Sequence, residues 1–535
     1  MGTNFAGWFS LTMTGTGKAG TRIVFYPSEI LSSSGLANQA STGHPIFDGY
    51  TLSGSSSETY TQKFMYHAFR YVQVNGITWT PQASNMQGHI IRATLDSVGS
   101  VSTSNGQFNS IHKIMDRALQ SNLHSVMTDC PHREKLGWID EYHLLIDPIS
   151  RLYDYEAYGR QFMKNFMDTQ ASNGYVPTIA PQLTVFTGEF YDDPNWGSAI
   201  IWLPYYLYHQ YGDTDILSDY YSHMQSYLNF LTNTKASGYL LQYGVGDWAS
   251  TDKTTPVGVP ATFAYSQAVG VMEVIATALG KTSDALTYSV LKSNILSAFH
   301  SKYFNATTKA GYCSGSQTCN AMALDMGAVP TGYYSVVMDS LANSIINNGY
   351  HLTVGEIANP SLWRSLQSGG RNDVLYNVMS IETSPSYGYM LAGGATSLWE
   401  YLNGVGGAYN HFMYGYPDSW FTALSGLAQS NTSVAWQAID YRPLTLSGLT
   451  SASHSYRTIR GTASADWSLS GSTLTYDIVV PVGSIGTVYL NRTTITESGS
   501  AISAGSNGII SVSTSGSNTT AIKVSSGTYY FKSVP

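Results

Sequence analysis

The sequence predicts a multidomain α+β protein in which a helical domain lies between two β-domains. The chain has 535 residues, well beyond the roughly 250–300 at which a single hydrophobic core stops growing, so we expect several domains. Apolar residues alternate with polar ones up to about residue 105, and again from about residue 441. Between these segments they recur at i, i+3, i+4 and i+7, which indicates helices with one buried face. The predicted domains are therefore 1–105, 106–440 and 441–535.

The N-terminal domain, residues 1–105, contains short apolar runs separated by Gly, Ser and Asn turns. We predict strands at 22–31, 69–79 and 89–95. The central domain, residues 106–440, has room for about a dozen helices of the usual ~11–12 residues, which suits a closed toroid of paired helices. The predicted helices cover 108–127, 155–170, 198–212, 283–304, 336–348, 372–380 and 418–429.

The C-terminal domain, residues 441–535, is rich in Ser, Thr and Gly, with apolar residues at alternate positions. A disordered linker is the weaker interpretation, because the alternation is regular and the segment ends in the aromatic run 529–531. We therefore predict a β-sandwich.

Composition excludes several functional classes. Only 11% of the residues are charged and 13% are aromatic, which argues against disorder. The net charge of −8 provides no basic surface for nucleic acid. No stretch reaches 18 apolar residues, so we expect neither a membrane span nor a membrane partner. We also expect the protein to be a monomer.

Cysteines and sequons indicate an extracellular protein. We expect Cys313 and Cys319 to form a disulfide across a short loop and Cys130 to be a free, buried thiol. The first twenty residues lack the pattern of a signal peptide, and we expect that such a signal has been removed from a secreted glycoprotein. The N-glycosylation sequons are Asn305, Asn431, Asn491 and Asn518.

The densest charged segment is TDCPHREKLGWIDE, residues 128–141. Apolar and rigid residues interrupt its charges, which favours a partly buried functional loop over a solvated one. Further turns combine glycine, tryptophan and an acid: 192–199, GVGDWAS at 244–250, and 384–404, which contains Glu400. A single tryptophan is more often a core residue than a sugar platform, but four such turns together indicate a saccharide pocket.

These motifs resemble the α-L-rhamnosidases of glycoside hydrolase family 78 over nearly the whole chain. The resemblance implies a central (α/α)6 barrel flanked by N-terminal and C-terminal antiparallel β-sandwich domains, and recognition of a terminal α-L-rhamnosyl unit. The matching segments are GTNFAGW (2–8), YHAFRYVQV (66–74), DCPHREKLGW (129–138), GYVPTIAP (174–181), GDW (246–248), PSYGYML (385–391), GATSLWE (394–400) and NHFMYG (410–415).

The resemblance also implies roles for individual residues. Glu134 matches the general acid of the family and Glu400 its general base. Carboxylates of this kind, roughly 6.5–9.5 Å apart, admit a water molecule and lead to inversion. The other residues expected to bind the sugar are Asp129, Arg133, Trp138, Glu141, Asp247, Trp248 and His411.

One departure from the hydrolase pattern leads to a different primary hypothesis. The hydrolases typically continue as Trp-Thr-Gly-Asp, whereas residues 138–141 here read Trp-Ile-Asp-Glu. The minimal domain layout looks like that of the L-rhamnose-α-1,4-D-glucuronate lyases, polysaccharide lyase family 27. We therefore expect an exo-acting lyase that releases terminal L-rhamnose from rhamnosyl-α-1,4-D-glucuronate of gum arabic type by β-elimination. An inverting α-L-rhamnosidase is the alternative.

Elimination needs a base for the C5 proton and cations that neutralise the uronate. The resemblance to these lyases implies a histidine that acts as base and acid, matched here by His67, and an arginine helped by a second histidine that neutralises the uronate, matched by Arg151 and His89. The structural alternatives are that His67 is a satisfied strand histidine and that Arg151 pairs with Asp154 along a helix.

Two further functional classes fit the sequence less well. A carbohydrate-binding protein without catalysis is less well supported, because Glu134 and Glu400 are both present. No two histidines stand four apart on a predicted helix, so we expect no catalytic metal and no required cofactor, although acid-rich turns could bind a structural calcium ion.

Overall fold

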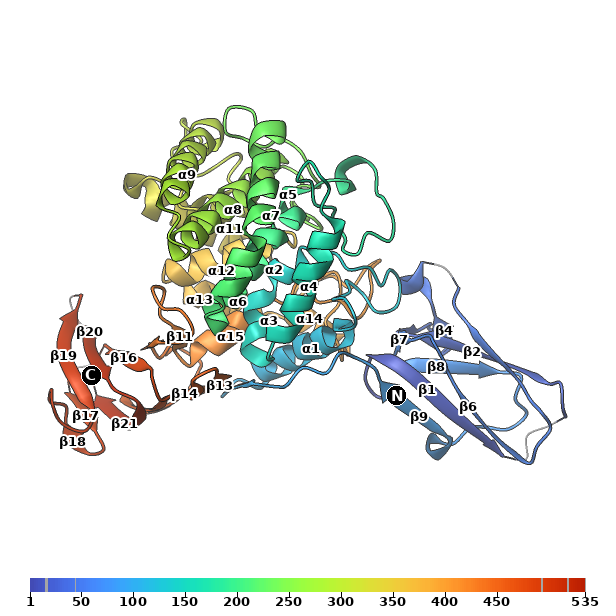
Figure 1. The fold of residues 1–535 in the computed structure, drawn as a ribbon. Helices are drawn as coiled ribbons and strands as arrows, with labels where there is room; N and C mark the ends of the chain where they lie inside the picture. Colours follow the sequence, from blue (N-terminus) through green and yellow to red (C-terminus); the bar gives the residue numbers. More distant parts are fainter. Residues whose placement is uncertain (15–17, 44, 492–493, 517–518, 535) are drawn as a thin grey trace. The chain divides into compact units, whose positions relative to one another are not determined.

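The computed structural model describes residues 1–14, 18–43, 45–491, 494–516 and 519–534 (Figure 1). The sequon at Asn518 lies outside these residues. The chain folds into two compact units, each assembled from three segments. Unit 1 comprises Met1–Thr94, Ser110–Trp138 and Ile381–Gly415. Unit 2 comprises Leu95–Asn109, Ile139–Ser380 and Tyr416–Pro535. Secondary structure is mixed and segregated along the chain, as the sequence predicts.

The β-structure of unit 1 is built around strand β1, Phe5–Thr14. Strands β6 (Ser57–Thr61) and β7 (His67–Phe69) pair with one edge of β1, and β9 (Met86–Ile90) pairs with the other. Alternate residues of β1 are buried, so their side chains point to one face and form a core. That core contains Phe5, Phe9, Leu11, Met13, Ile23, Phe25, Leu52 and Phe69.

Two smaller antiparallel sheets complete this β-region. One contains β5 (Asp48–Thr51), β2 (Arg22–Ser28) and β8 (Tyr71–Asn75), and the other contains β3 (Ile30–Leu31) and β4 (Ala37–Asn38). The strands predicted at 22–31 and 69–79 therefore form, with shorter and divided bounds. The strand predicted at 89–95 is mostly wrong, because β9 lies earlier in the chain and ends at Ile90.

Unit 1 also contains most of α1 (Gly106–Asn122) and the short helix α14 (Tyr387–Ala392). After α14 the chain forms a tight loop that carries Glu400. The Leu398 N–H donates to Ile114 O of α1 at 2.9 Å, and the His411 N–H donates to Leu398 O at 2.9 Å. These backbone bonds hold the 398–411 loop in place.

Unit 2 contains a body of helices, coloured from cyan through green to yellow in Figure 1. Successive long helices pack on each other, as in the pairs α6/α7 and α8/α9. The first of these pairs turns at Gly212, which is left-handed (φ 77°), and at Asp213, whose carboxylate caps α7 by accepting the Ile216 N–H. The helices are α2 (Glu141–Leu144), α3 (Ile146–Leu152), α4 (Glu156–Thr169), α5 (Pro194–Gly197), α6 (Ala199–Tyr211), α7 (Thr214–Phe230), α8 (Gly258–Ala278), α9 (Thr282–Tyr303), α10 (Gln317–Asp325), α11 (Tyr334–Asn347), α12 (Ala358–Ser368), α13 (Asn372–Ser380) and α15 (Asp418–Leu424).

The helix predicted over 418–429 is shorter than expected. It ends at Leu424, and Leu427–Gln429 forms strand β11 instead. Gly426 has a φ of +86°, which ends the helix, and an added Cβ there would clash with the backbone of Arg442.

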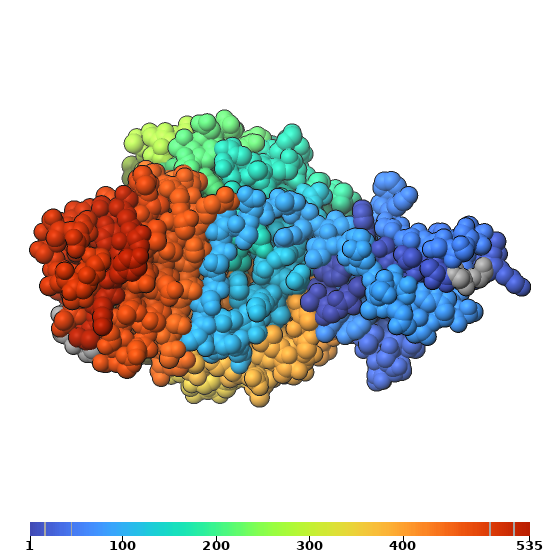
Figure 2. Space-filling model, turned by 90° about the horizontal axis from the view of Figure 1, so that it is seen from below, coloured from blue at the N-terminus to red at the C-terminus, as the bar shows by residue number. Residues whose placement is uncertain are grey.

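Two further sheets belong to unit 2. The seven-stranded sheet has the order β10-β13-β14-β15-β21-β17-β18, and the five-stranded sheet has the order β11-β12-β16-β20-β19. Their pairs are antiparallel except β12 with β16, which run parallel. The surface of the residues after 441 is orange to red in Figure 2. The strands are β10 (Gly99–Thr103), β12 (Ala438–Tyr441), β13 (Ser451–Thr458), β14 (Gly461–Ser470), β15 (Thr473–Val480), β16 (Ile485–Leu490), β17 (Thr494–Glu497), β18 (Ser500–Ala501), β19 (Ile509–Ser515), β20 (Thr519–Val524) and β21 (Gly527–Val534).

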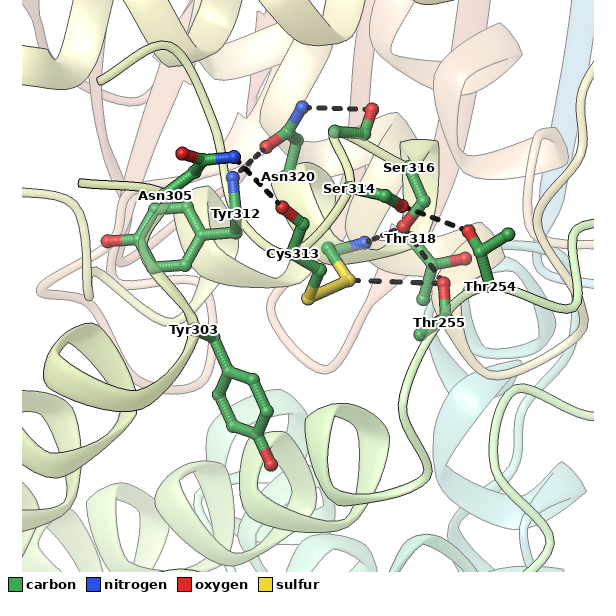
Figure 3. Close-up of a disulfide and its surroundings, with 12 residues drawn as sticks. Thr254, Thr255, Tyr303, Asn305, Tyr312, Cys313, Ser314, Ser316, Thr318 and Asn320 are labelled. Carbon is green, nitrogen blue, oxygen red and sulfur yellow. Dashed lines mark hydrogen bonds between the residues drawn. A yellow bond between two sulfur atoms is a disulfide. The ribbon is translucent and has the colours of Figure 1, made fainter. Parts of the chain in front are cut away.

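The predicted cysteine states are confirmed. Cys313 and Cys319 form a disulfide, and Cys130 is free and buried. Figure 3 shows the bridge beside Thr254 and Thr255, and the Thr255 hydroxyl lies 2.9 Å from that of Ser316. Among the helices described, we find none with the length and apolar character needed to span a bilayer.

Candidate active site

The loop 129–138 of unit 1 is held rigid by its own hydrogen bonds. The Leu136 N–H donates to Asp129 Oδ1 at 3.1 Å, and the Asp129 N–H donates back to Leu136 O at 3.2 Å. The Glu134 N–H donates to Cys130 Sγ at 3.4 Å, and Lys135 takes a left-handed backbone conformation (φ 58°). Asp129 and Cys130 are buried while Glu134 is exposed, so the loop directs one carboxylate inward and one outward.

Arg133 joins the two glutamates that the sequence singled out. Its Nη2 donates to Glu134 Oε1 at 2.9 Å and to both oxygens of Glu400 at 3.0 Å. The Trp138 indole N–H donates to Glu134 Oε2 at 3.2 Å. Residues 267 apart in sequence thus meet at one guanidinium, and Glu134, Glu400, Arg133 and Trp138 form a single cluster.

Glu400 is buried and its environment keeps it ionised. Burial acts to raise the pKa of Glu400, but His411, the Ala408 N–H and Arg133 together hold the pKa below its usual value. The Ala408 N–H donates to Glu400 Oε2 at 2.7 Å. Gly407 is required for this approach, because a Cβ there would lie 2.7 Å from Glu400 Cβ. Burial lowers the pKa of His411, against the pull of the Glu400 charge.

Asp129 is buried, whereas Glu134 is exposed. Burial, and then the charge of Glu134, raise the pKa of Asp129 to about 8. Burial and the charge of Asp129 also raise the pKa of the Cys130 thiol well above its ordinary value. The Cys130 S–H donates to Asp129 Oδ2 at 2.9 Å.

Donor atoms of Asp129, Cys130 and Glu134 lie within 4.8 Å of one another, close enough to hold a metal ion. Metal ligands must be deprotonated, however, and the raised pKa values of the thiol and of Asp129 oppose this. The contacts fit a hydrogen-bonded cluster better than a metal centre.

The two histidines of the elimination hypothesis lie on different strands of unit 1. His67 is on β7 and only 2% exposed, and its Nε2 lies 3.1 Å from Asp48 Oδ2. His89 is on β9, where its Nε2 lies 3.0 Å from the Ser10 hydroxyl. Because β7 and β9 pair with opposite edges of β1, the structure does not bring the two imidazoles together.

Arg151 belongs to unit 2, where α3 carries it. Its Nη2 lies 3.0 Å from Asp147 Oδ1, one helical turn earlier. The expected structural partner, Asp154, is therefore wrong: the chain leaves α3 after Leu152, so Asp154 does not continue the helical face of Arg151.

A second acidic cluster lies within unit 2, around the residues that follow Trp138. Glu141 is buried at the start of α2, next to Asp140. The pKa of Asp140 is raised to about 7, mainly by burial and to a smaller extent by the charge of Asp193, against a hydrogen bond with Glu356 that acts to lower it. Glu356 was not predicted as a site residue, and its only sequence signal is an acid isolated in the apolar stretch 352–360.

Asp247 and Trp248 have different surroundings in unit 2. The Asp247 carboxylate accepts hydrogen bonds from the Thr318 hydroxyl (2.5 Å), the Gly355 N–H (2.8 Å) and the Ala358 N–H (3.0 Å). It therefore anchors the start of α12. Trp248 is 36% exposed and packs edge-on against Phe190, with ring centroids 5.1 Å apart. Its indole is accessible to a ligand.

Comparison with known protein families decides the affiliation of the chain. The model of the bacterial α-L-rhamnosidase six-hairpin glycosidase domain matches residues 96–424. The chain belongs to the bacterial α-L-rhamnosidase family. The concanavalin-like domain of bacterial α-L-rhamnosidases matches residues 1–92, and their C-terminal domain matches residues 426–504.

Individual α-L-rhamnosidases are similar to this chain along most of its length. One from Formosa agariphila is 27% identical over 529 residues, covering 92% of this chain and 55% of that protein. One from Streptomyces avermitilis is 28% identical over 482 residues, covering 87% and 46%. The solved α-L-rhamnosidase from Dictyoglumus thermophilum superposes with a TM-score of 0.92 at 29% identity, covering 100% of this chain and 61% of that one. The chain spans about half the length of the curated relatives it matches.

Membership of the α-L-rhamnosidase family corrects the primary functional hypothesis. The elimination reaction, and with it the glucuronate and gum arabic substrate, is wrong: the matching family models and the relatives are α-L-rhamnosidases, not polysaccharide lyases of family 27. The change from Trp-Thr-Gly-Asp to Trp-Ile-Asp-Glu therefore does not support the lyase hypothesis. Glu134 and Glu400, the expected hydrolytic pair, lie in one cluster with Arg133.

Proposed function

We propose that this chain is an inverting α-L-rhamnosidase that hydrolyses terminal α-L-rhamnosides, with Glu134 as general acid and Glu400 as general base. The observation that carries the proposal is the bridge from Arg133 to both carboxylates, at 2.9 and 3.0 Å. Family membership supports the substrate class, and the related Streptomyces avermitilis α-L-rhamnosidase, 26% identical with a TM-score of 0.91, has been solved with L-rhamnose bound.

Glu134 suits the role of acid because its carboxylate can reach a substrate. The Glu134 side chain is 33% exposed, whereas Asp129 is 4% exposed and bonded to its own loop. We therefore assign Asp129 a positioning role. Arg133, Trp138 and His411, which lie in the same unit as Glu134 and Glu400, are the proposed sugar contacts.

Glu400 suits the role of base because its lowered pKa keeps it ionised. The distances to Arg133 Nη2 limit the separation of the facing Glu134 and Glu400 oxygens to about 6 Å, shorter than the roughly 6.5–9.5 Å typical of inverting enzymes. Inversion thus requires Glu134 to swing away from Arg133, which its exposed side chain permits.

The remaining features of the proposal are coarser. The helices of unit 2 pack in pairs, which supports an (α/α)6 barrel. We propose that this barrel is the middle one of three domains, 1–105, 106–440 and 441–535. We also propose that the protein is a secreted monomer. It needs no cofactor, because two carboxyl groups and a water molecule suffice for hydrolysis.

The test is hydrolysis of an aryl α-L-rhamnoside by the full chain and by Glu134→Gln and Glu400→Gln. Each variant should lose about 10²–10⁴-fold in kcat with little change in KM, because general acid–base groups act mainly in the transition state. Glu382→Gln, an exposed site in the same unit, is the matched control and should keep full rate. Full activity in either glutamine variant would overturn the assignment, and no hydrolysis by the parent chain would overturn the proposed function.

A further inference from the structure

Unit 1 contains a cavity of about 220 Å³ that none of the proposed catalytic side chains lines. It lies below the roughly 300–1,000 Å³ typical of sites for drug-sized ligands, so it suits one small molecule. Its lining includes Asn4, Glu29, Leu31, Arg70, Ala395 and Trp399.

Two buried acceptors form the polar part of this cavity. Glu29, 3% exposed, accepts the Asn4 Nδ2–H on Oε1 and the Tyr409 N–H on Oε2, both at 3.0 Å. Ser41 is a third hydrogen-bond partner of Glu29. A carboxylate has about four acceptor positions, so Glu29 can accept about one further hydrogen bond. Asn4 is also 3% exposed, and its Oδ1 has no hydrogen-bond partner among the described residues. An unpaired buried acceptor is costly, and a ligand hydroxyl would satisfy it.

A fixed indole forms the apolar part. Trp399 packs edge-on against Tyr409 and Tyr389, with ring centroids 5.2 and 6.4 Å apart. Glycine is needed at 393 and 404, where a Cβ would lie 2.7 and 2.5 Å from the indole. The two glycines thus leave the space that the Trp399 indole occupies.

The lining contains one acid, Glu29, and one cation, Arg70, and its other residues are neutral. Burial raises the pKa of Glu29, although hydrogen bonds from Tyr409, Asn4 and Ser41 act to lower it. Arg70 donates one N–H to Gly394 O at 2.9 Å, which leaves further guanidinium donors for a ligand. A single acid does not provide the several oxygen ligands that a metal cation needs, and a buried acid disfavours an anion, so the lining favours a neutral ligand.

We propose that this cavity is a second carbohydrate site, which binds one neutral pyranose through Glu29, Asn4 and Arg70 with Trp399 as an apolar wall. The hydroxyl groups of a pyranose can donate hydrogen bonds to Glu29 and Asn4. Its hydroxyl and ring oxygens can accept hydrogen bonds from the Arg70 guanidinium, and its C–H face can pack on the indole of Trp399. The cavity and the proposed base are linked by two consecutive backbone amides. The Ala408 N–H donates to Glu400, and the next N–H, of Tyr409, donates to Glu29.

The test measures binding of methyl β-D-galactopyranoside and methyl β-D-glucopyranoside to the full chain by saturation-transfer NMR and calorimetry. Ala395→Phe fills the cavity and should weaken binding about tenfold or more. Ala392→Phe is the matched control, since it adds the same ring three residues away at an exposed position outside the lining. Aryl rhamnoside hydrolysis, followed in parallel, should be unchanged in both variants, so this proposal and the proposed function fail separately.

If Ala395→Phe does not fold, Leu31→Trp narrows the cavity from a rim position that is 40% exposed. Three results would overturn the proposal. These are no binding of either glycoside by the parent chain, equal binding by the cavity-filled variant and the control, or stabilisation by calcium ions in place of sugar.

Discussion

At the scale of single residues, the guanidinium of Arg133 contacts both proposed catalytic carboxyl groups and helps to lower the pKa of Glu400. Replacing it with glutamine removes a positive charge 3.0 Å from Glu400, so the ionised form loses stabilisation and the pKa of Glu400 rises. We expect the acidic limb of the kcat/KM profile of Arg133→Gln to move to higher pH. In Arg133→Lys the charge remains but the planar fork is lost, so kcat should fall with a smaller shift of that limb. An unshifted limb in Arg133→Gln would contradict the assignment of Glu400 as base.

The buried carboxyl of Asp129 should make stability depend on pH. Its pKa of about 8 in the folded protein exceeds the ordinary 3.8, so the folded state holds a proton that the unfolded state releases. The contribution of this group to stability is therefore complete below pH 3.8 and is lost as pH rises towards 8. The Asp129→Asn variant carries an amide that cannot ionise, so its free energy of unfolding should fall less steeply over this range. Urea unfolding at several pH values measures the slopes, and parallel slopes would show that Asp129 titrates normally.

At the scale of elements, Asp247 fixes the entry to α12. Asp247→Ala leaves the Thr318 hydroxyl and two backbone N–H groups without their acceptor, at about 1–3 kcal/mol for each buried group left unpaired. We expect the free energy of unfolding to fall by about 3 kcal/mol or more, as measured by denaturant titration. Asp168→Ala, which removes only an exposed ion pair with Lys164, should change it by about 1 kcal/mol or less. Equal effects of the two substitutions would refute the anchoring role.

Periodicity predicted those helices that bury one face. The helices predicted at 155–170, 198–212 and 283–304 appear as α4, α6 and α9 with bounds shifted by one or two residues. Helix α8, with 21 residues, was not predicted because most of its surface is buried and its apolar residues therefore show no period. The helix predicted at 418–429 fails at Gly426, where backbone conformation overrides the apolar pattern.

At the scale of the whole molecule, the proposed mechanism determines the anomer released. An inverting enzyme places a water molecule, activated by Glu400, on the face opposite the leaving group, so an α-L-rhamnoside should yield β-L-rhamnose first. Proton NMR recorded before mutarotation distinguishes the anomers. Initial α-L-rhamnose would mean that Glu400 attacks directly, which a separation of at most about 6 Å between the facing oxygens would allow.

The sequence by itself determined the order of β-, helical and β-structure, the family resemblance and the disulfide, and it supplied Glu134 and Glu400 as candidate catalytic residues. These follow from periodicity and from motifs that are local in the chain. Tertiary structure decided what lies beside what: that β10, Gly99–Thr103, joins the sheet of β13, that one guanidinium joins Glu134 to Glu400, and that Asp247 is occupied by backbone donors. Such pairings join residues that are distant in the sequence, so neighbouring residues do not encode them. They matter for function because the partners and the burial of a side chain set its pKa and its accessibility.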